Sequence, residues 1–173
     1  MHRQAYEFVQ RVMRDVDPAG LRVLEFGSYN VNGTVRPLFP GAAEYVGVDL
    51  RAGPGVDVVA DAATVDGLED FDVLVCCEVL EHTPDPAALI TAAWRSLKPG
   101  GALILTAAGP GRAPHGVNGG PVGREHYANI TPAALDAWLS DWEHDITTDP
   151  QAGDVYAIAR KPSEEKEEPC ASF

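Results

Sequence analysis

The sequence predicts an α/β domain with a doubly wound, mainly parallel sheet and an antiparallel edge. Between residues 3 and 108, apolar strand-like runs alternate with segments of helical periodicity, which is typical of parallel sheets covered by helices. The run over 71–79 is apolar almost throughout, as expected of a strand that is buried on both faces. Two strand-like runs at 144–149 and 154–160 follow each other directly, so they are expected to form the antiparallel edge.

The part of the chain before the central strand is expected to contain one helix and three strands. Apolar residues recur at helical spacing over about 3–16 and predict an amphipathic helix, which Asp17, Pro18 and Gly20 end. Short apolar runs bounded by turn residues then predict strands at 21–26, 44–50 and 56–61.

Helices are expected on either side of a long loop in the second half. Asp85 can cap a helix over 85–97, because its carboxylate accepts from free N–H groups of the first turn, and the stretch from Lys98 to Gly101 ends it. A fifth strand is expected at 102–108. Thr131 can cap the last helix, over 132–142. The Gly- and Pro-rich segment between them, 109–129, is long enough to be functional or disordered.

Length and charge limit the classes of partner. The chain has 173 residues, which suits one domain over 1–162, and the charged segment 163–173 is expected to be a disordered tail. The formal net charge of −13 argues against binding to nucleic acid or to an anionic membrane, since such binding depends on Lys and Arg. The N-terminal residues contain no uninterrupted apolar segment, so neither a signal peptide nor a membrane span is expected there. The sequence carries no signal for a particular oligomeric state.

Three cysteines predict neither a disulfide framework nor a metal site. Cys76 and Cys77 are adjacent, so in a strand their side chains point to opposite faces of the sheet. A reduced, cytoplasmic setting is the simplest interpretation.

Polar groups follow each of the four central strands at its carboxyl end. Parallel strands bring these ends to one edge of the sheet, where ligands of such folds bind. Gly27 and Gly33 allow backbone conformations and close approaches that a Cβ atom would block. The polar residues at these ends are Glu25, Ser28, Asp49, Asp61 and Glu78.

A nucleoside lying across that edge would account for the pattern. Asp49, after the second strand, can accept hydrogen bonds from both ribose hydroxyls. Asp61 can accept from an exocyclic adenine amine, with the backbone N–H of Ala62 facing a ring nitrogen and Leu50 lying against the base. A single acid at a strand end is often only a turn or cap residue, so the prediction depends on the whole set.

Five segments resemble the motifs of class I S-adenosylmethionine-dependent methyltransferases that act on small molecules. The first, VLEFGSYNVNG, differs from the usual glycine motif, which has a second glycine where this chain has Tyr29 or Asn30. Pro37 and Pro40 shorten the helix that normally follows it. The resemblance covers about residues 21–108. The other segments are YVGVDL, VVADA, VLVCCEVLEH and LKPGGALILTA.

The resemblance implies a Rossmann-like sheet, S-adenosylmethionine as cofactor and methyl transfer to a small or medium-sized acceptor. It places the ribose on Asp49 and the adenine on Asp61. Glu25 would support the methionine ammonium, directly or through water, although it could instead only organise the turn. A loop glycine would let the main chain approach the ligand. The acceptor itself, whether a sugar, another metabolite, a lipid-linked group or a protein side chain, is left open.

The loop 109–129 is expected to cover the acceptor, because it follows the fifth strand beside the cofactor edge. His126, Tyr127 and His115 are the candidate catalytic residues, with a general base needed only if the nucleophile must lose a proton early. For each histidine, a surface or packing position is the simpler alternative. His82, just before a helix, is expected to be structural.

Two other functions share part of this pattern. An NAD-dependent oxidoreductase would have the same strand, glycine turn and acid after the second strand, but the Gly-x-Gly-x-x-Gly spacing is absent. A non-catalytic nucleoside-binding protein of the same fold would keep every feature described above.

Overall fold

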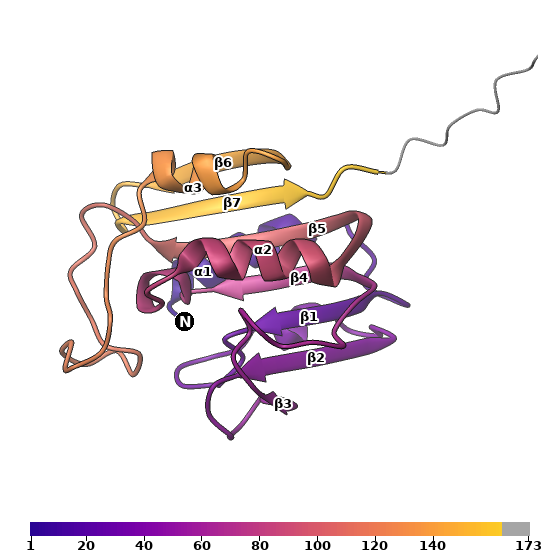
Figure 1. Cartoon of the computed structure of the whole chain (residues 1–173), viewed down its shortest axis with the longest axis horizontal. Helices are drawn as coiled ribbons and strands as arrows, with labels where there is room; N and C mark the ends of the chain where they lie inside the picture. The colour runs from indigo at the N-terminus through magenta and orange to yellow at the C-terminus, as the bar shows by residue number, and fades with distance from the viewer. Residues whose placement is uncertain (164–173) are drawn as a thin grey trace, which may run out of the picture.

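The computed structural model describes residues 1–163, which form a seven-stranded sheet in the order β3-β2-β1-β4-β5-β7-β6 (Figure 1). Neighbouring strands from β3 to β5 are parallel, and β7 runs antiparallel to both β5 and β6. The predicted fold class is therefore confirmed. The strands are β1 (Arg22–Phe26), β2 (Glu44–Asp49), β3 (Val58–Val59), β4 (Phe71–Cys77), β5 (Leu97–Ala108), β6 (Glu143–Asp149) and β7 (Asp154–Arg160).

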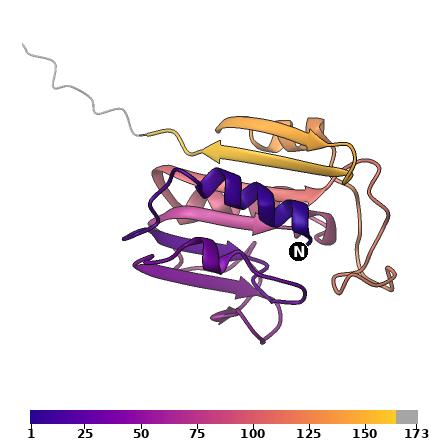
Figure 2. The ribbon, with the colours of Figure 1, turned by 180° about the vertical axis from the view of Figure 1, so that it is seen from behind.

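Helices cover both faces of the sheet. One face carries α2 (Pro86–Ser96) and α3 (Pro132–Trp138), which lie toward the viewer in Figure 1. The other carries α1 (Arg3–Met13) and the 3₁₀ turn η1 (Arg36–Leu38), as seen from behind in Figure 2. A second 3₁₀ turn, η2 (Leu80–His82), follows β4.

The core consists of two apolar clusters, one on each face of the sheet. Cys76 belongs to the cluster under α2 and α3, and Cys77 to the cluster under α1. The two adjacent cysteines thus point to opposite faces, as predicted, and both are buried free thiols. The caps of α2 and α3 are also as predicted: Asp85 accepts from the N–H of Ala88, and Thr131 accepts from that of Ala134.

Several element boundaries differ from the sequence predictions; α1 ends at Met13 and α3 at Trp138, before the expected ends at about 16 and at 142. β3 was expected over 56–61 but has only two residues, since only these two pair with β2. β5 was expected over 102–108 but begins at Leu97, which was expected to be the last residue of the helix: Leu97 pairs with Phe71, and the register then shifts before Val73 pairs with Ala102. After β1, the chain forms only η1, which agrees with the expected shortening of this helix by Pro37 and Pro40, since a proline within a helix removes a hydrogen bond and clashes with the preceding turn.

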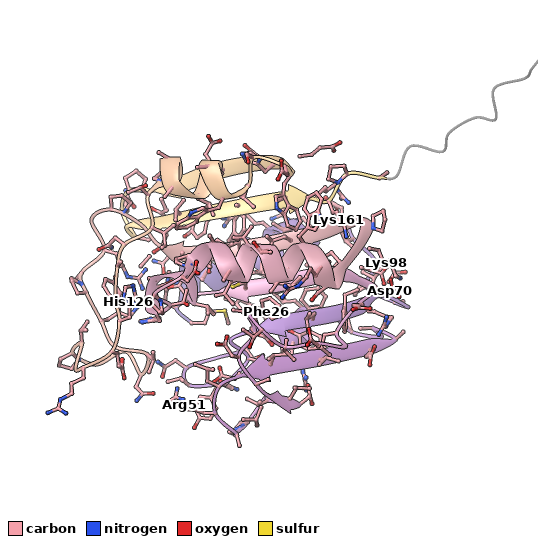
Figure 3. The ribbon with its side chains drawn as sticks, viewed as in Figure 1. Phe26, Arg51, Asp70, Lys98, His126 and Lys161 are labelled. Carbon is pink, nitrogen blue, oxygen red and sulfur yellow. The ribbon has the colours of Figure 1, made fainter. Side chains whose placement is uncertain are left out.

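The carboxyl ends of the parallel strands lie at one end of the molecule, together with the loop 109–129. Arg51 and His126 lie at this end in Figure 3, while Asp70 and Lys98 lie at the opposite end. Residues 164–173, which make up nearly all of the predicted tail, lie outside the described part of the chain. No helix within residues 1–163 has the length and apolar character needed to cross a membrane.

Candidate functional site

A cavity of about 910 Å³ lies at the carboxyl ends of the parallel strands. That volume is in the range of small-molecule and cofactor sites. The structure brings all nine residues that were predicted to contact the cofactor into its wall, together with His115 and His126, whereas Tyr127 is not part of it. Their functional roles remain predictions. The nine are Glu25, Gly27, Ser28, Gly33, Asp49, Leu50, Asp61, Ala62 and Glu78.

The turn after β1 requires glycine at position 27 for a reason within the fold. Gly27 has a φ of +75°, and its N–H donates to the carbonyl of Val48 at 2.9 Å. A Cβ atom on Gly27 would lie 2.2 Å from Cγ2 of Val79. The positive φ agrees with the predicted need for glycine, and the contact with the segment after β4 is a second reason for it; close approach of a ligand to this turn stays a prediction.

Asp49, the last residue of β2, is held in place by two backbone donors. Its Oδ2 accepts from the N–H of Tyr29 at 3.2 Å, and its Oδ1 accepts from the N–H of Arg51 at 3.1 Å. A carboxylate has about four acceptor positions, so about two remain for donors from a ligand. The two backbone bonds fix the orientation of the carboxylate in the cavity wall.

An apolar side chain and a second acid lie next to Asp49. Leu50 is 71% exposed although it lines the cavity, so its apolar surface is available to a flat ligand group. Asp61 follows β3, and its Oδ1 accepts from the N–H of Ala63 at 2.9 Å. The edge of the sheet thus presents an exposed leucine between two oriented carboxylates.

Glu25 lies beneath these groups in β1 and is only 6% exposed. The hydroxyl of Tyr45 donates to its Oε2 at 2.8 Å. Burial raises the pKa of Glu25 to about 7, although the Tyr45 hydrogen bond and the charge of Arg36 oppose this shift. The carboxyl group therefore changes its charge near neutral pH, on the inner wall of the cavity.

Replacing Glu25 with glutamine should remove part of the pH dependence of folding. A carboxyl whose pKa rises from 4.5 to about 7 on folding stabilises the fold below pH 4.5, and this stabilisation disappears as the pH rises through 7. Between pH 5 and 8 the wild type should lose about 2–3 kcal/mol more unfolding free energy than Glu25→Gln. Urea denaturation of both proteins at the two pH values measures this, and parallel losses would show that Glu25 is ionised throughout.

Glu78 directly follows β4 and has an unusual backbone conformation, with a φ of +59°. The hydroxyl of Thr106 donates to its Oε1 at 3.0 Å, and Nε2 of His2 lies 3.1 Å from its Oε2. A positive φ in a residue other than glycine costs free energy and is often found at functional sites. The neighbouring contacts hold the Glu78 side chain at the cavity wall.

A charged cluster joins the N-terminal segment to β7 next to Glu78. Asp154, 2% exposed, forms an ion pair with Arg112 and lies 3.2 Å from Nε2 of His2. Burial alone would lower the pKa of His2, but hydrogen bonds to Asp154 and Glu78 raise it to about 10. Arg112, which pairs with Asp154 and lies 2.8 Å from Nε2 of His2, anchors the start of the loop 109–129.

The three candidate catalytic residues occupy different positions in the loop. His126 lines the cavity and its side chain is exposed. His115 also lines the cavity, and its ring lies 5.0 Å from that of Tyr127. The Tyr127 hydroxyl donates to the carbonyl of Ala113 at 3.5 Å, so Tyr127 is positioned behind His115 and outside the cavity wall.

The family model of a methyltransferase domain matches residues 1–146. The chain belongs to this family. A ubiquinone biosynthesis O-methyltransferase of Xanthomonas oryzae pv. oryzae (strain PXO99A) is 38% identical over 113 residues, which cover 60% of this chain and 45% of that protein. The methyltransferase domain therefore spans about half the length of this curated relative.

Two solved structures share the fold of this methyltransferase domain. One is the Burkholderia thailandensis 1,6-didemethyltoxoflavin-N1-methyltransferase with bound 1,6-didemethyltoxoflavin and S-adenosylhomocysteine, with a TM-score of 0.67 and 17% identity over 92% of this chain and 79% of that one. The other is a [4+2]-cyclase, with a TM-score of 0.63 and 17% identity over 90% and 80% of the two chains. At these identities the likeness concerns the fold.

Two side chains of the methyltransferase domain were not assigned to the site from the sequence. His2 reaches it through contacts with Glu78 and Asp154, far along the chain, for which the sequence gives no local signal. His82 was expected to be structural, yet it lines the cavity. Its position directly after Glu81, in the segment VLVCCEVLEH at the end of a parallel strand, was the available signal.

Proposed function

We propose that this methyltransferase domain binds S-adenosylmethionine and transfers its methyl group to a small or medium-sized acceptor. The observation that carries this proposal is a single cavity, in a member of a methyltransferase family, with acids from three successive strand ends in its wall: Glu25, Asp49 and Asp61. Family membership also argues against the oxidoreductase alternative. The structurally similar Burkholderia thailandensis methyltransferase, by its title, contains S-adenosylhomocysteine, the product form of this cofactor.

Each part of the cofactor has a matching group in the wall. Asp49 would accept from the ribose hydroxyls with the acceptor positions that Tyr29 and Arg51 leave free. Asp61 and the backbone N–H of Ala62 would recognise the adenine edge, and the exposed Leu50 would cover one face of the base.

The methionine end would lie deeper, beside the turn formed by Gly27, Ser28 and Gly33. Glu25 would hold the ammonium group as a carboxylate, and Glu78 would border the same end of the ligand. Because an ammonium ion favours the ionised form of a nearby carboxyl, cofactor binding would lower the pKa of Glu25 from its value of about 7.

Methyl transfer from a sulfonium needs little chemical activation of the donor. The protein can accelerate it by holding the acceptor in line with the methyl group and by excluding water. His126 and His115 line the acceptor side of the cavity, and His126 is the proposed base where the acceptor carries a proton. The similar proteins include, by name, an O-methyltransferase and an N-methyltransferase, so hydroxyl and ring-nitrogen acceptors are the first to test.

Replacing Asp49 with alanine should weaken S-adenosylmethionine binding by about 1.5–3 kcal/mol, since it removes charge-assisted hydrogen bonds to the ribose. Isothermal titration calorimetry of the wild type, Asp49→Ala and Asp49→Asn measures the effect. Asp49→Asn keeps the side chain's shape and one acceptor oxygen, so its loss should be smaller. Unchanged affinity in both variants would remove Asp49 from the cofactor site.

Turnover separates an enzyme from a protein that only binds the cofactor. Formation of S-adenosylhomocysteine in the presence of a phenol or a nitrogen heterocycle, above the rate without acceptor, is the expected result for the proposed activity. We also propose a cytoplasmic setting, which fits the two buried free thiols of Cys76 and Cys77.

A further inference from the structure

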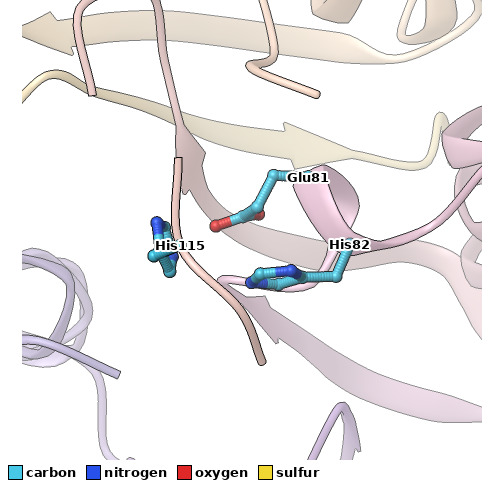
Figure 4. A group of neighbouring side chains, drawn as sticks. All are labelled: Glu81, His82 and His115. Atoms are coloured by element: carbon cyan, nitrogen blue, oxygen red, sulfur yellow. The ribbon is translucent and has the colours of Figure 1, made fainter. Parts of the chain in front are cut away.

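Glu81, His82 and His115 form a compact group at the acceptor side of the cavity (Figure 4). The first two belong to η2, directly after β4, and His115 belongs to the loop 109–129. One ligand atom from each side chain lies within 4.8 Å of the others. In Figure 4 the Glu81 carboxyl group and the His82 ring both extend toward His115.

Two polar atoms of this group are buried without a hydrogen-bond partner among the described residues. Glu81 has no exposed surface; its Oε1 accepts from the N–H of Ala108 at 3.2 Å, but its Oε2 accepts from no donor in residues 1–163. Nδ1 of His82 is likewise buried and unpaired in that part of the chain. A buried polar atom without a partner costs about 1–3 kcal/mol, so such atoms call for a partner such as an ion.

The third side chain is oriented as metal-binding histidines usually are. The Nδ1 of His115 lies 3.2 Å from the carbonyl oxygen of Ala113, to which it can donate its proton. That tautomer leaves the lone pair on Nε2 free, and a hydrogen bond from the other ring nitrogen to a backbone carbonyl is the common way to fix such a ligand. The ring of Tyr127 packs edge-on against both His115 and His82.

A second cluster of acidic and histidine side chains differs from this group, because its carboxylates have cationic partners. His2, Glu78 and Asp154 are equally close together, but Arg112 pairs with Asp154 and lies 3.8 Å from Glu78. Its carboxylates therefore have cationic partners within the protein. The Glu81 group has no Lys or Arg among its ion pairs in the described residues.

We propose that Glu81, His82 and His115 bind one divalent transition-metal ion, with Zn²⁺ and Co²⁺ as the best-suited probes. Two imidazoles and one carboxylate form a ligand set that suits such ions better than Mg²⁺ or Ca²⁺, which prefer oxygen ligands. Ligand atoms on one tetrahedral ion lie about 3.3 Å apart, so a movement of the loop by about 1.5 Å would bring His115 into place.

The position of this ion gives it access to the acceptor. His82 and His115 both line the cavity, so a fourth coordination position would face the cavity interior. Catalytic metal sites usually have three protein ligands and one coordination position that is open to water or substrate. In such sites the ion lowers the pKa of the oxygen ligand that it binds. Metal binding itself does not depend on the proposed methyl transfer, and it is measured separately from activity.

Titration of tag-free protein, first treated with a chelator and dialysed, tests the proposal. Calorimetry with Zn²⁺ should show one ion per chain, with a Kd below about 100 μM. Co²⁺ should produce visible absorption bands of a four- or five-coordinate site. His115→Ala should weaken Zn²⁺ binding at least about tenfold, because it removes one of three ligands. His144→Ala removes a histidine on β6, far from the cavity, and should leave the affinity unchanged.

His115→Ala is the main test, because His115 belongs to the loop 109–129, whereas Leu80 and Glu81 of η2 are buried and a change there could prevent folding. Glu81→Gln, which keeps the size of the side chain, is the second test and should also weaken Zn²⁺ binding at least about tenfold. Absence of Zn²⁺ and Co²⁺ binding up to about 1 mM would overturn the proposal. Equal Zn²⁺ affinity in the wild type and His115→Ala would overturn it as well, since any ion would then be bound elsewhere.

Discussion

Gly27→Ala should lower the free energy of unfolding by about 2–4 kcal/mol. The backbone at this position has a φ of +75°, which an L-residue with a Cβ atom adopts at a cost of about 1–2 kcal/mol. The new methyl group would also lie 2.2 Å from Cγ2 of Val79, so the segment after β4 must shift. Urea denaturation followed by circular dichroism measures the loss.

Gly67→Ala is the matched control for this variant. Gly67 has a φ of +76°, almost the same as Gly27, but a Cβ atom there would meet no heavy atom within 4 Å. It should therefore show only the cost of the backbone conformation, about 1–2 kcal/mol. If both variants lose the same free energy, Val79 moves aside without cost and the turn after β1 is not held by that contact.

His126→Ala should lower methyl transfer about 10²–10⁴-fold if the residue is a general base, and less if it only orients the acceptor. His126 lines the cavity from the loop 109–129, whereas the groups proposed for the cofactor belong to the ends of β1, β2, β3 and β4. S-adenosylmethionine affinity should therefore barely change. The measurement pairs a turnover rate, with an acceptor found by screening, and a cofactor binding constant for the same variant.

Arg124→Ala is a suitable control, because Arg124 is exposed in the same loop and does not line the cavity. It should keep both turnover and cofactor affinity. Equal loss of turnover and affinity in His126→Ala would indicate that the residue supports the cofactor pocket or the fold. No loss of either would mean that His126 is a surface residue without a role in the reaction.

The sheet and the cofactor side of the cavity could be predicted because both follow from local patterns. Alternating apolar runs identified the parallel strands, and parallel strands necessarily bring their carboxyl ends together. Residues as distant in sequence as Glu25 and Glu78 therefore line one cavity. The side chains of Cys76 and Cys77 point to opposite faces because successive residues of a strand alternate between faces, which is also a local property.

The remaining features depend on contacts that no local pattern contains. The position of His2 is fixed by Glu78 and Asp154, which lie far along the chain. The contact that Val79, on another strand connection, would make with a Cβ atom at position 27 is a second such feature. The short β3 and the early start of β5 are set by the residues of β2 and β4 that pair with them.

The surroundings of His82 also depend on a distant segment of the chain. A histidine just before a helix start is compatible with a cap or packing position, and the sequence predicted no metal site. Only the folded chain brings His115 from the loop 109–129 next to it, with their ring centroids 5.2 Å apart. The same loop's length made it a candidate for function, but its path could not be derived from glycines and prolines alone.

Calorimetric titration of the wild-type protein with S-adenosylmethionine, S-adenosylhomocysteine and NAD⁺ tests the central claim most directly. The cavity with Asp49 and Asp61 at its edge predicts one site per chain for the two sulfur nucleosides and no binding of NAD⁺ at the same concentrations. Tight binding of NAD⁺ without binding of either sulfur nucleoside would contradict the proposed cofactor and the activity that depends on it.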